Sequence, residues 1–260
     1  MKFKNIIFQI NENVAVINLN RPEKLNSFNR TMATEVQNAL DDCAADKTVR
    51  AILLSGVGKG FCAGQDLDEA IDKNGPSIKE IVNTTYNPII HKIRNIEKPV
   101  VCAVNGVAAG AGANIALACD ITLAARSAYF VQSFSKIGLI PDSGGTFFLP
   151  RIVGLQRAAA MAMLGDKVSA VQAFEMGMIY KVCSDATIKA ESMEIAKKLA
   201  EMPTKGLGLT KRGFNRAFYN TIDQQLEFEL ELQVEAGNSY DYNEGVKAFL
   251  EKRKPKFKGE

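Results

Sequence analysis

The chain has few of the residues on which many enzyme classes depend. Its 260 residues include one histidine, His91, and no tryptophan. A Ser-His-Asp or Cys-His site would have to use His91, and a metal site built from several histidines is excluded. Because His91 falls on a helical stretch beside Lys92 and Arg94, we expect it at the surface. The formal net charge of +3 is too small to indicate nucleic-acid or membrane binding.

Cysteine is also scarce and shows no paired spacing. The odd number and the absence of Cys-x-x-Cys predict a reduced, cytoplasmic protein, with thiols at Cys43, Cys62, Cys102, Cys119 and Cys183. The apolar run at the N-terminus stops too soon for a signal peptide. The uncharged stretch 99–119 nominally qualifies as a membrane span. Its glycines and asparagines instead predict a buried strand, a tight loop and a buried helix.

What is present is an alternation of strand and helix signals in the first half. Val14–Leu19 is short and β-branched, and apolar residues from Met32 to Cys43 recur at helical spacing after a candidate cap, Asn29. Three further apolar segments read as buried strands: 50–54, 100–104 and 120–124. Uniformly apolar strands separated by helices predict an α/β fold with a largely parallel sheet covered on both faces.

The second half is expected to be helical from about Gly145 onward. A last long helix, Thr221 to about Ala236, carries two apolar stripes: Ile222, Leu226, Leu230 and Val234 on one, and Phe228, Leu232 and Val234 on the other. Two apolar faces indicate packing against another subunit as well as the helix's own core. The basic tail 252–258 is either a solvated end or a phosphate contact.

Two glycine-rich loops, 56–64 and 106–112, each follow a buried strand. The second lacks the third glycine of a dinucleotide fingerprint, since Ile115 stands there, and the first lacks the Lys-Ser/Thr of a phosphate loop. What remains is unhindered backbone, whose N–H groups can point outward. Two such loops converging on one carbonyl oxygen would form an oxyanion hole. The alternative is close packing of strand and helix.

Five motifs in order resemble the enoyl-CoA hydratase/isomerase (crotonase) superfamily. They are RPEKLNS at 21–27, FCAGQDL at 61–67, NGVAAGAG at 105–112, GLIPDSGGT at 138–146 and EGVKAFLEKR at 244–253. The resemblance implies a spiral of ββα repeats that binds acyl-CoA, here 1–200. It also implies a C-terminal helical trimerisation region, here 201–260, and trimers often paired into hexamers. Coenzyme A would enter as part of the substrate, with no separate cofactor and no metal.

The resemblance also assigns roles to individual positions. The enolate of the thioester would be stabilised by two backbone N–H groups, those of Gln65 and Ala111. Coenzyme A would be held by two groups of residues: Lys24, Leu25, Ala63, Asp66, Leu67 and Gly112 in one subunit, and Phe249 and Lys252 reaching the nucleotide of a neighbouring subunit.

The same comparison restricts the reaction. Superfamily hydratases place a water with two glutamates, but those positions are Asn114 and Phe134 here, which we assign to the substrate pocket. Neither an amide nor a phenyl ring can act as a general base. Alkene hydration by the standard route is therefore not expected.

Asp142 is the carboxylate of the fourth motif. The motifs resemble one branch most: isomerases of bacterial phenylacetate degradation that turn ring-1,2-epoxyphenylacetyl-CoA into oxepin-CoA and also shift Δ3 double bonds to Δ2. In that branch this aspartate is the acid/base residue. The simpler interpretation is a helix N-cap; capping would stabilise the anion, whereas burial among neighbouring phenylalanines would raise its pKa. Asp66, expected to turn its loop, and Asp68, expected to open a helix, are the next candidates.

Two other functions remain open from the sequence. One is an enoyl-CoA hydratase with nonstandard water activation. The other is a non-catalytic subunit that binds coenzyme A, or a partner enzyme, in a degradation complex. The missing hydratase glutamates support the second, and Asp142 counts against it.

Overall fold

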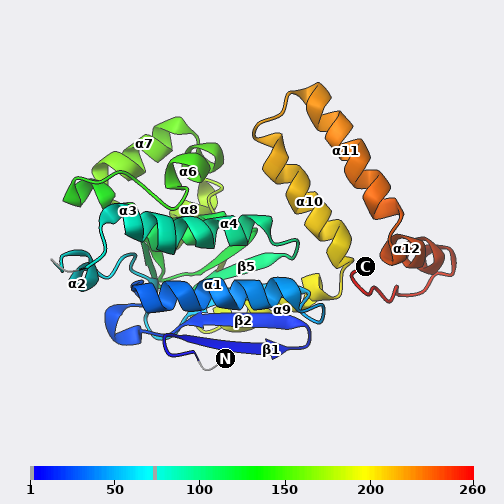
Figure 1. Ribbon diagram of the computed structural model, residues 1–260, viewed down its shortest axis with the longest axis horizontal. Helices are drawn as coiled ribbons and strands as arrows, with labels where there is room; N and C mark the ends of the chain where they lie inside the picture. Colours follow the sequence, from blue (N-terminus) through cyan, green and yellow to red (C-terminus); the bar gives the residue numbers. More distant parts are fainter. Residues whose placement is uncertain (1–2, 73–74) are drawn as a thin grey trace.

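Two sheets form the body of the protein. The computed structural model describes residues 3–72 and 75–260 (Figure 1). The larger sheet has the strand order β1-β2-β3-β5-β7-β10 and the smaller one β4-β6-β8-β9. The pairs β1·β2 and β8·β9 are antiparallel and every other pair is parallel. The strands are β1 Ile6–Asn11, β2 Val14–Leu19, β3 Ala51–Gly56, β4 Gly60–Cys62, β5 Val100–Val104, β6 Val107–Ala109, β7 Ile121–Ala125, β8 Tyr129–Val131, β9 Lys167–Ser169 and β10 Lys181–Cys183.

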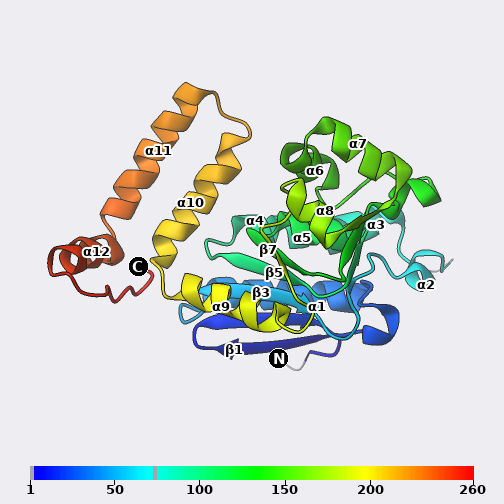
Figure 2. The same ribbon diagram turned by 180° about the vertical axis from the view of Figure 1, so that it is seen from behind.

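Helices cover the sheets and form the C-terminal part. Helices α1 and α9 lie on opposite sides of the larger sheet (Figures 1 and 2). The helices are α1 Arg30–Ala45, α2 Leu67–Ala70, α3 Ile78–Ile81, α4 Asn87–Asn95, α5 Ala111–Ala118, α6 Gly145–Val153, α7 Leu155–Leu164, α8 Ala170–Glu175, α9 Ile188–Ala200, α10 Thr204–Ala217, α11 Ile222–Gly237 and α12 Tyr240–Leu250. Two 3₁₀ turns, η1 Pro22–Lys24 and η3 Ser133–Ile137, and one π-helical turn, η2 Val82–Tyr86, complete the regular structure of residues 3–72 and 75–260.

The chain repeats one unit. Strands β3, β5 and β7 follow one another in the larger sheet, and each is followed by a short strand, β4, β6 or β8, in the smaller sheet. Helices or helical turns separate the successive pairs. The expected spiral of ββα repeats, with a largely parallel sheet, is therefore confirmed.

Sequence periodicity located the longer elements. The helix predicted from the spacing of Met32 to Cys43 is α1. The Asn29 side chain accepts a hydrogen bond from Met32 N at 2.9 Å, as expected of an N-cap. Thr221 caps the last long helix, α11. The prediction of an all-helical second half was wrong, because β9 and β10 interrupt it. The glycine-rich loops also contain strands that we did not predict, β4 and β6; three-residue strands are too short to show a period.

Helices α10 to α12 stand away from the sheets in both views (Figures 1 and 2). One link to the body is polar: Lys211 Nζ of α10 lies 2.8 Å from Asp120 Oδ2, and Arg94 NH1 of α4 lies 3.2 Å from Asp120 Oδ1. The Arg50 guanidinium reaches the C-terminal tail, with NH1 2.7 Å from Phe257 O. No helix in the described part of the chain combines the length and apolar character needed to span a bilayer.

Candidate active site

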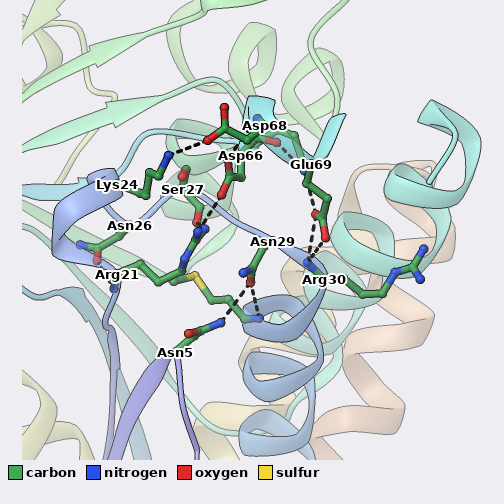
Figure 3. Close-up of polar contacts among 12 residues, drawn as sticks. Asn5, Arg21, Lys24, Asn26, Ser27, Asn29, Arg30, Asp66, Asp68 and Glu69 are labelled. Carbon is green, nitrogen blue, oxygen red and sulfur yellow. Dashed lines mark hydrogen bonds and ion pairs between the residues drawn. The ribbon is translucent and has the colours of Figure 1, made fainter. Parts of the chain in front are cut away.

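The first glycine-rich loop is fastened to the turn before α1. The Arg21 guanidinium pairs with Asp66 at 2.7 Å, and Lys24 Nζ pairs with Asp68 at 2.6 Å (Figure 3). The backbone adds a further link, because Ala63 N donates to Leu25 O at 3.0 Å. The structure thus brings together the two segments that the sequence assigned to coenzyme A. Lys24, Leu25 and Leu67 remain exposed there.

The two runner-up carboxylates have structural roles. Asp66 is buried, paired with Arg21, and caps α2 through a hydrogen bond from Asp68 N at 3.2 Å. Asp68 is exposed, and its hydrogen bond from Lys24 holds the pKa of its carboxyl below the usual range. Both residues follow the expected pattern of a turn and a helix start. Both carboxylates are thus engaged in ion pairs in this structure.

The predicted donors Gln65 and Ala111 lie on adjacent loops. Phe28 N donates to Gly64 O, and Asp66 N donates to Phe28 O. Because Gly64 and Asp66 pair with Phe28, the N–H of Gln65 between them points away from Phe28. Ala111 is the first residue of α5. Neither N–H has an acceptor among residues 3–72 and 75–260. A helix leaves its first N–H groups free in this way, and they favour an anion.

Glycine permits the close approach of these loops. Gly64 has φ +92°, and a Cβ on it would lie 2.9 Å from Ala109 O and 3.6 Å from Ala111 N. Gly112 is buried against β4, where a Cβ would lie 2.4 Å from Cys62 O. Gly112 therefore packs helix against strand, which was the simpler interpretation of a glycine here.

Tyr86 supports the first donor and was missed by sequence analysis. It ends the π-helical turn η2, is almost fully buried, and donates a hydrogen bond from its hydroxyl to Gln65 Oε1 at 2.8 Å. Burial raises the pKa of Tyr86 well above its ordinary value, and the charge on Asp142 adds to this rise. Sequence carries no signal for this pair, because Tyr86 and Gln65 are 21 residues apart and no periodicity links them.

Asp142 lies in the turn that precedes α6. Its carboxylate accepts a hydrogen bond from Ser143 Oγ at 2.8 Å and has no ion-pair partner in the described part of the chain. Burial raises the pKa of the Asp142 carboxyl above its usual range. The N-cap interpretation was wrong: Gly144, in the left-handed region at φ +74°, takes the cap position, and no side chain of the described residues caps α6. Asp142 is therefore free of a capping role.

The two pocket residues lie beside these groups. Phe134 is 7% exposed, and a Cβ on Gly110 would lie 3.7 Å from its ring. Asn114 has no exposed surface at all; its Nδ2 donates to Asp142 O at 2.9 Å and its Oδ1 accepts from Gln132 Nε2 at 2.8 Å. Asn114 therefore lies behind the Asp142 turn, in contact with protein on both sides.

A cavity of about 310 Å³ opens next to the same turn. It is bordered by Gly144, by Phe147 and Phe148 of α6, and by Phe218 and Tyr219 in the turn after α10. Phe147 stacks on Tyr219, with ring centroids 5.8 Å apart. Aromatic rings thus form one wall of the cavity, and His91, Arg94, Asn95 and Asn215 add polar groups to its lining.

Phe249 and Lys252 are not part of this cluster in one chain. Both are exposed at the end of α12, at the opposite end of the molecule from α2 (Figures 1 and 2). Phe249 borders a groove of about 650 Å³ between α10, α11 and α12. His91 is exposed on α4, as expected.

The arrangement of two ββα-derived loops, one of them opening a helix, defines a crotonase-type protein. The chain superposes on the crystal structure of the enoyl-CoA hydratase from Bacillus anthracis with a TM-score of 0.92, at 31% identity over 99% of this chain and 100% of that one. The enoyl-CoA hydratase/isomerase family model matches residues 9–260. The chain belongs to the enoyl-CoA hydratase/isomerase family.

Two curated relatives indicate where in the family the chain lies. It is 50% identical to the 1,2-epoxyphenylacetyl-CoA isomerase of Escherichia coli over 98% of both chains. It is 35% identical to the trans-2-decenoyl-acyl-carrier-protein isomerase of Streptococcus mutans over the full length of both. The expected family, its branch and the class of superfamily isomerase are thereby confirmed. The role of each site residue stays a prediction.

Proposed function

We propose that the protein is an acyl-CoA isomerase that converts ring-1,2-epoxyphenylacetyl-CoA to oxepin-CoA and shifts Δ3-enoyl-CoA double bonds to Δ2. The observation that carries the proposal is Asp142, a half-buried carboxylate that has no cationic partner among the described residues and a raised pKa. A base of this kind suits proton transfer to and from carbon. The identity to a 1,2-epoxyphenylacetyl-CoA isomerase supports the choice of substrate.

The double-bond shift needs one base and no co-reactant. Asp142 takes a proton from the carbon next to the thioester, and the electron pair moves onto the thioester oxygen. The N–H groups of Gln65 and Ala111 stabilise the resulting enolate. When the proton returns two carbons further on, the double bond moves into conjugation with the thioester. Substrate and product are isomers, so atoms and electrons balance.

A second set of residues would bind coenzyme A. Lys24 and the backbone of the first glycine-rich loop would contact coenzyme A from the same chain. Phe249 and Lys252 would reach its nucleotide only from a second copy of the chain. We therefore propose a homotrimer, or a hexamer of two trimers, as the working form. The five buried, unpaired cysteines support a reducing, cytoplasmic setting.

The deciding experiment separates products by chromatography and identifies them by ultraviolet absorption, because isomers share one mass. Purified protein is incubated with ring-1,2-epoxyphenylacetyl-CoA, with a Δ3-enoyl-CoA and with crotonyl-CoA. We expect oxepin-CoA and Δ2-enoyl-CoA, with little hydration of crotonyl-CoA. Hydration in excess of isomerisation would indicate a hydratase instead, and binding without any turnover would indicate a silent coenzyme A-binding subunit.

A further inference from the structure

The local hydrogen bonds of the turn that carries Asp142 do not tie it to the rest of the protein. Ser143 and Gly144 are both left-handed, with φ +51° and +74°, and α6 begins without a side-chain cap. The carbonyl oxygen of Asp142 accepts two hydrogen bonds, from Gly145 N at 2.7 Å and from Asn114 Nδ2 at 2.9 Å. The first is local to the turn. Asn114 therefore provides the hydrogen bond that ties the turn to another element, α5.

The orientation of the Asn114 amide is determined by its partners. The Asp142 carbonyl only accepts, so the NH₂ group of Asn114 must face it and Oδ1 must face Gln132. Gln132 is 1% exposed and donates Nε2 to that oxygen at 2.8 Å, which leaves its own Oε1 buried and without a donor among the described residues. A reversed Gln132 would place two oxygens together. The Gln132 Oε1 thus stays buried without a hydrogen bond, at a cost in free energy, while Gln132 Nε2 holds the Asn114 side chain.

Steric contact leaves little freedom around this amide. A Cβ built on Gly145 would lie 2.3 Å from Asn114 Nδ2, so the start of α6 presses directly on the Asn114 side chain. Asn114 also lies one turn after Ala111 in α5. A single helix therefore carries the proposed donor and the residue that holds the proposed base.

We propose that Asn114 and Gln132 are positioning residues that fix the Asp142 turn relative to the Ala111 N–H. This inference rests on the proposed function, in which Asp142 and Ala111 act on one substrate. It gives position 114 a role in this chain other than substrate contact. A carboxylate there would turn an oxygen toward the Asp142 carbonyl oxygen and push the turn away.

The direct test is Asn114→Asp, with Gln132→Met as the milder change at the second residue. We expect kcat on a Δ3-enoyl-CoA to fall about 10- to 100-fold for Asn114→Asp, because small displacements of a reacting group cost this much. KM should stay within about twofold. For Gln132→Met, which adds no charge, the acid limb of the pH profile should move to lower pH, because a looser turn gives Asp142 more water. Asn114→Asp does not serve for this readout, since its new carboxylate would itself raise the pKa of Asp142. The neighbouring titratable group is Tyr86, and the described residues place no cation in contact with the carboxylate.

Thr122→Val is the matched control. Thr122 is also buried and donates Oγ1 to Ala116 O at 2.7 Å, at the opposite end of α5. Its loss should lower the unfolding temperature and leave kcat and the pH profile unchanged. An equal loss of kcat in Thr122→Val would overturn the inference, since general weakening of α5 would then account for both.

A double-mutant cycle completes the test. Because Gln132 acts through Asn114, Asn114→Ala combined with Gln132→Met should be no slower than Asn114→Ala alone. If the two losses of kcat simply add, Gln132 does not act through Asn114 and the inference is contradicted. A fully active Asn114→Asp together with an inactive Asp142→Asn would overturn the positioning role alone. An active Asp142→Asn would overturn the proposed function itself.

Discussion

Asp142 is costly to ionise in the folded protein, because its carboxyl is partly desolvated and its hydrogen-bonded partner is the Ser143 hydroxyl, not a cation. Asp142→Asn keeps the size of the side chain but cannot exchange a proton. We expect turnover to fall by roughly 10²–10⁴. The free energy of unfolding should be unchanged or higher, because the buried charge is gone. Isomerisation by product absorbance, together with urea unfolding, measures both quantities.

Near-normal isomerisation by Asp142→Asn on both substrates would contradict the assignment. Asp66 or Asp68 would then be the next candidate for the catalytic base. Since Asp66 is paired with Arg21 and Asp68 with Lys24, such a result would mean that these pairs open when substrate binds.

The raised pKa of Asp142 also predicts the pH dependence of the reaction. The base is active only when ionised, so kcat/KM should rise with pH through a value above the ordinary range of an aspartic acid. Activity is lost below that value as the carboxyl protonates. An acid limb at or below an ordinary aspartate pKa would contradict the burial of the base in the free enzyme. The limb should disappear from the residual rate of Asp142→Asn.

Residue-level sequence reasoning can select a group by its chemistry, but it cannot tell which distant residues lie next to that group. Asp142 could be singled out because its motif offers one carboxylate. That the cap position falls to Gly144 depends on two consecutive left-handed residues, which no pattern marks. Tyr86 and Gln132 were missed because each acts on a residue far away in sequence.

At the scale of elements, the close approach of the two glycine-rich loops depends on Gly64. Gly64→Ala would place a methyl group 2.9 Å from Ala109 O in a conformation that L-residues disfavour, so the loop carrying the Gln65 N–H must move. We expect turnover to fall on the order of 10²-fold, the usual effect of losing one oxyanion donor. Steady-state kinetics on a Δ3-enoyl-CoA measures the loss.

Gly177→Ala separates this effect from backbone strain alone. Gly177 is also left-handed, at φ +75°, but an added Cβ meets no atom of the described residues within 4 Å. It should lose about 1 kcal/mol of stability and keep full turnover. If both variants lose turnover equally, the loop contact is not what positions the donor.

Periodicity predicted the elements that are long enough to show it. Helices α1 and α11 have several apolar residues at constant spacing and a recognisable cap, and strand β2 is marked by its β-branched composition. Strands β4 and β6 have three residues each, and the π-helical turn η2 has no sequence signature that distinguishes it from an ordinary helix. The site is built largely from such short pieces, so the sequence located its loops without their geometry.

At the scale of the whole molecule, α11 presents an apolar face that its own chain leaves uncovered. Ile222, Leu226, Leu230 and Val234 are each more than half exposed, whereas Leu232 packs inward. We expect light scattering to give about three or six times the 28.3 kDa of one chain. Leu226→Glu with Leu230→Glu should shift the protein toward monomer, and Glu227→Gln should not. A wild-type monomer at micromolar concentration would refute the proposed assembly.

Assembly would also explain the position of Lys252. Lys252 is exposed, left-handed at φ +53°, and free of ion pairs within the described residues. The loop that would hold coenzyme A lies at the opposite end of the molecule (Figures 1 and 2). Lys252→Ala should raise KM about 2- to 5-fold at low salt, as expected for an exposed ion pair. The penalty should shrink as salt is added. Lys254, which pairs with Glu201 at 2.8 Å, is the control in the same tail. An unchanged KM at low salt would exclude the phosphate contact.

All five thiols are buried in one chain, and burial raises the pKa of Cys43 and Cys62 to about 12. A thiol in this state does not react readily with maleimides at neutral pH. The burial of the native thiols therefore makes the protein a suitable host for site-specific labelling. One cysteine introduced at an exposed position, such as Asp223→Cys near the start of α11, would carry a single fluorophore. Mixing donor- and acceptor-labelled pools would then report subunit exchange in real time.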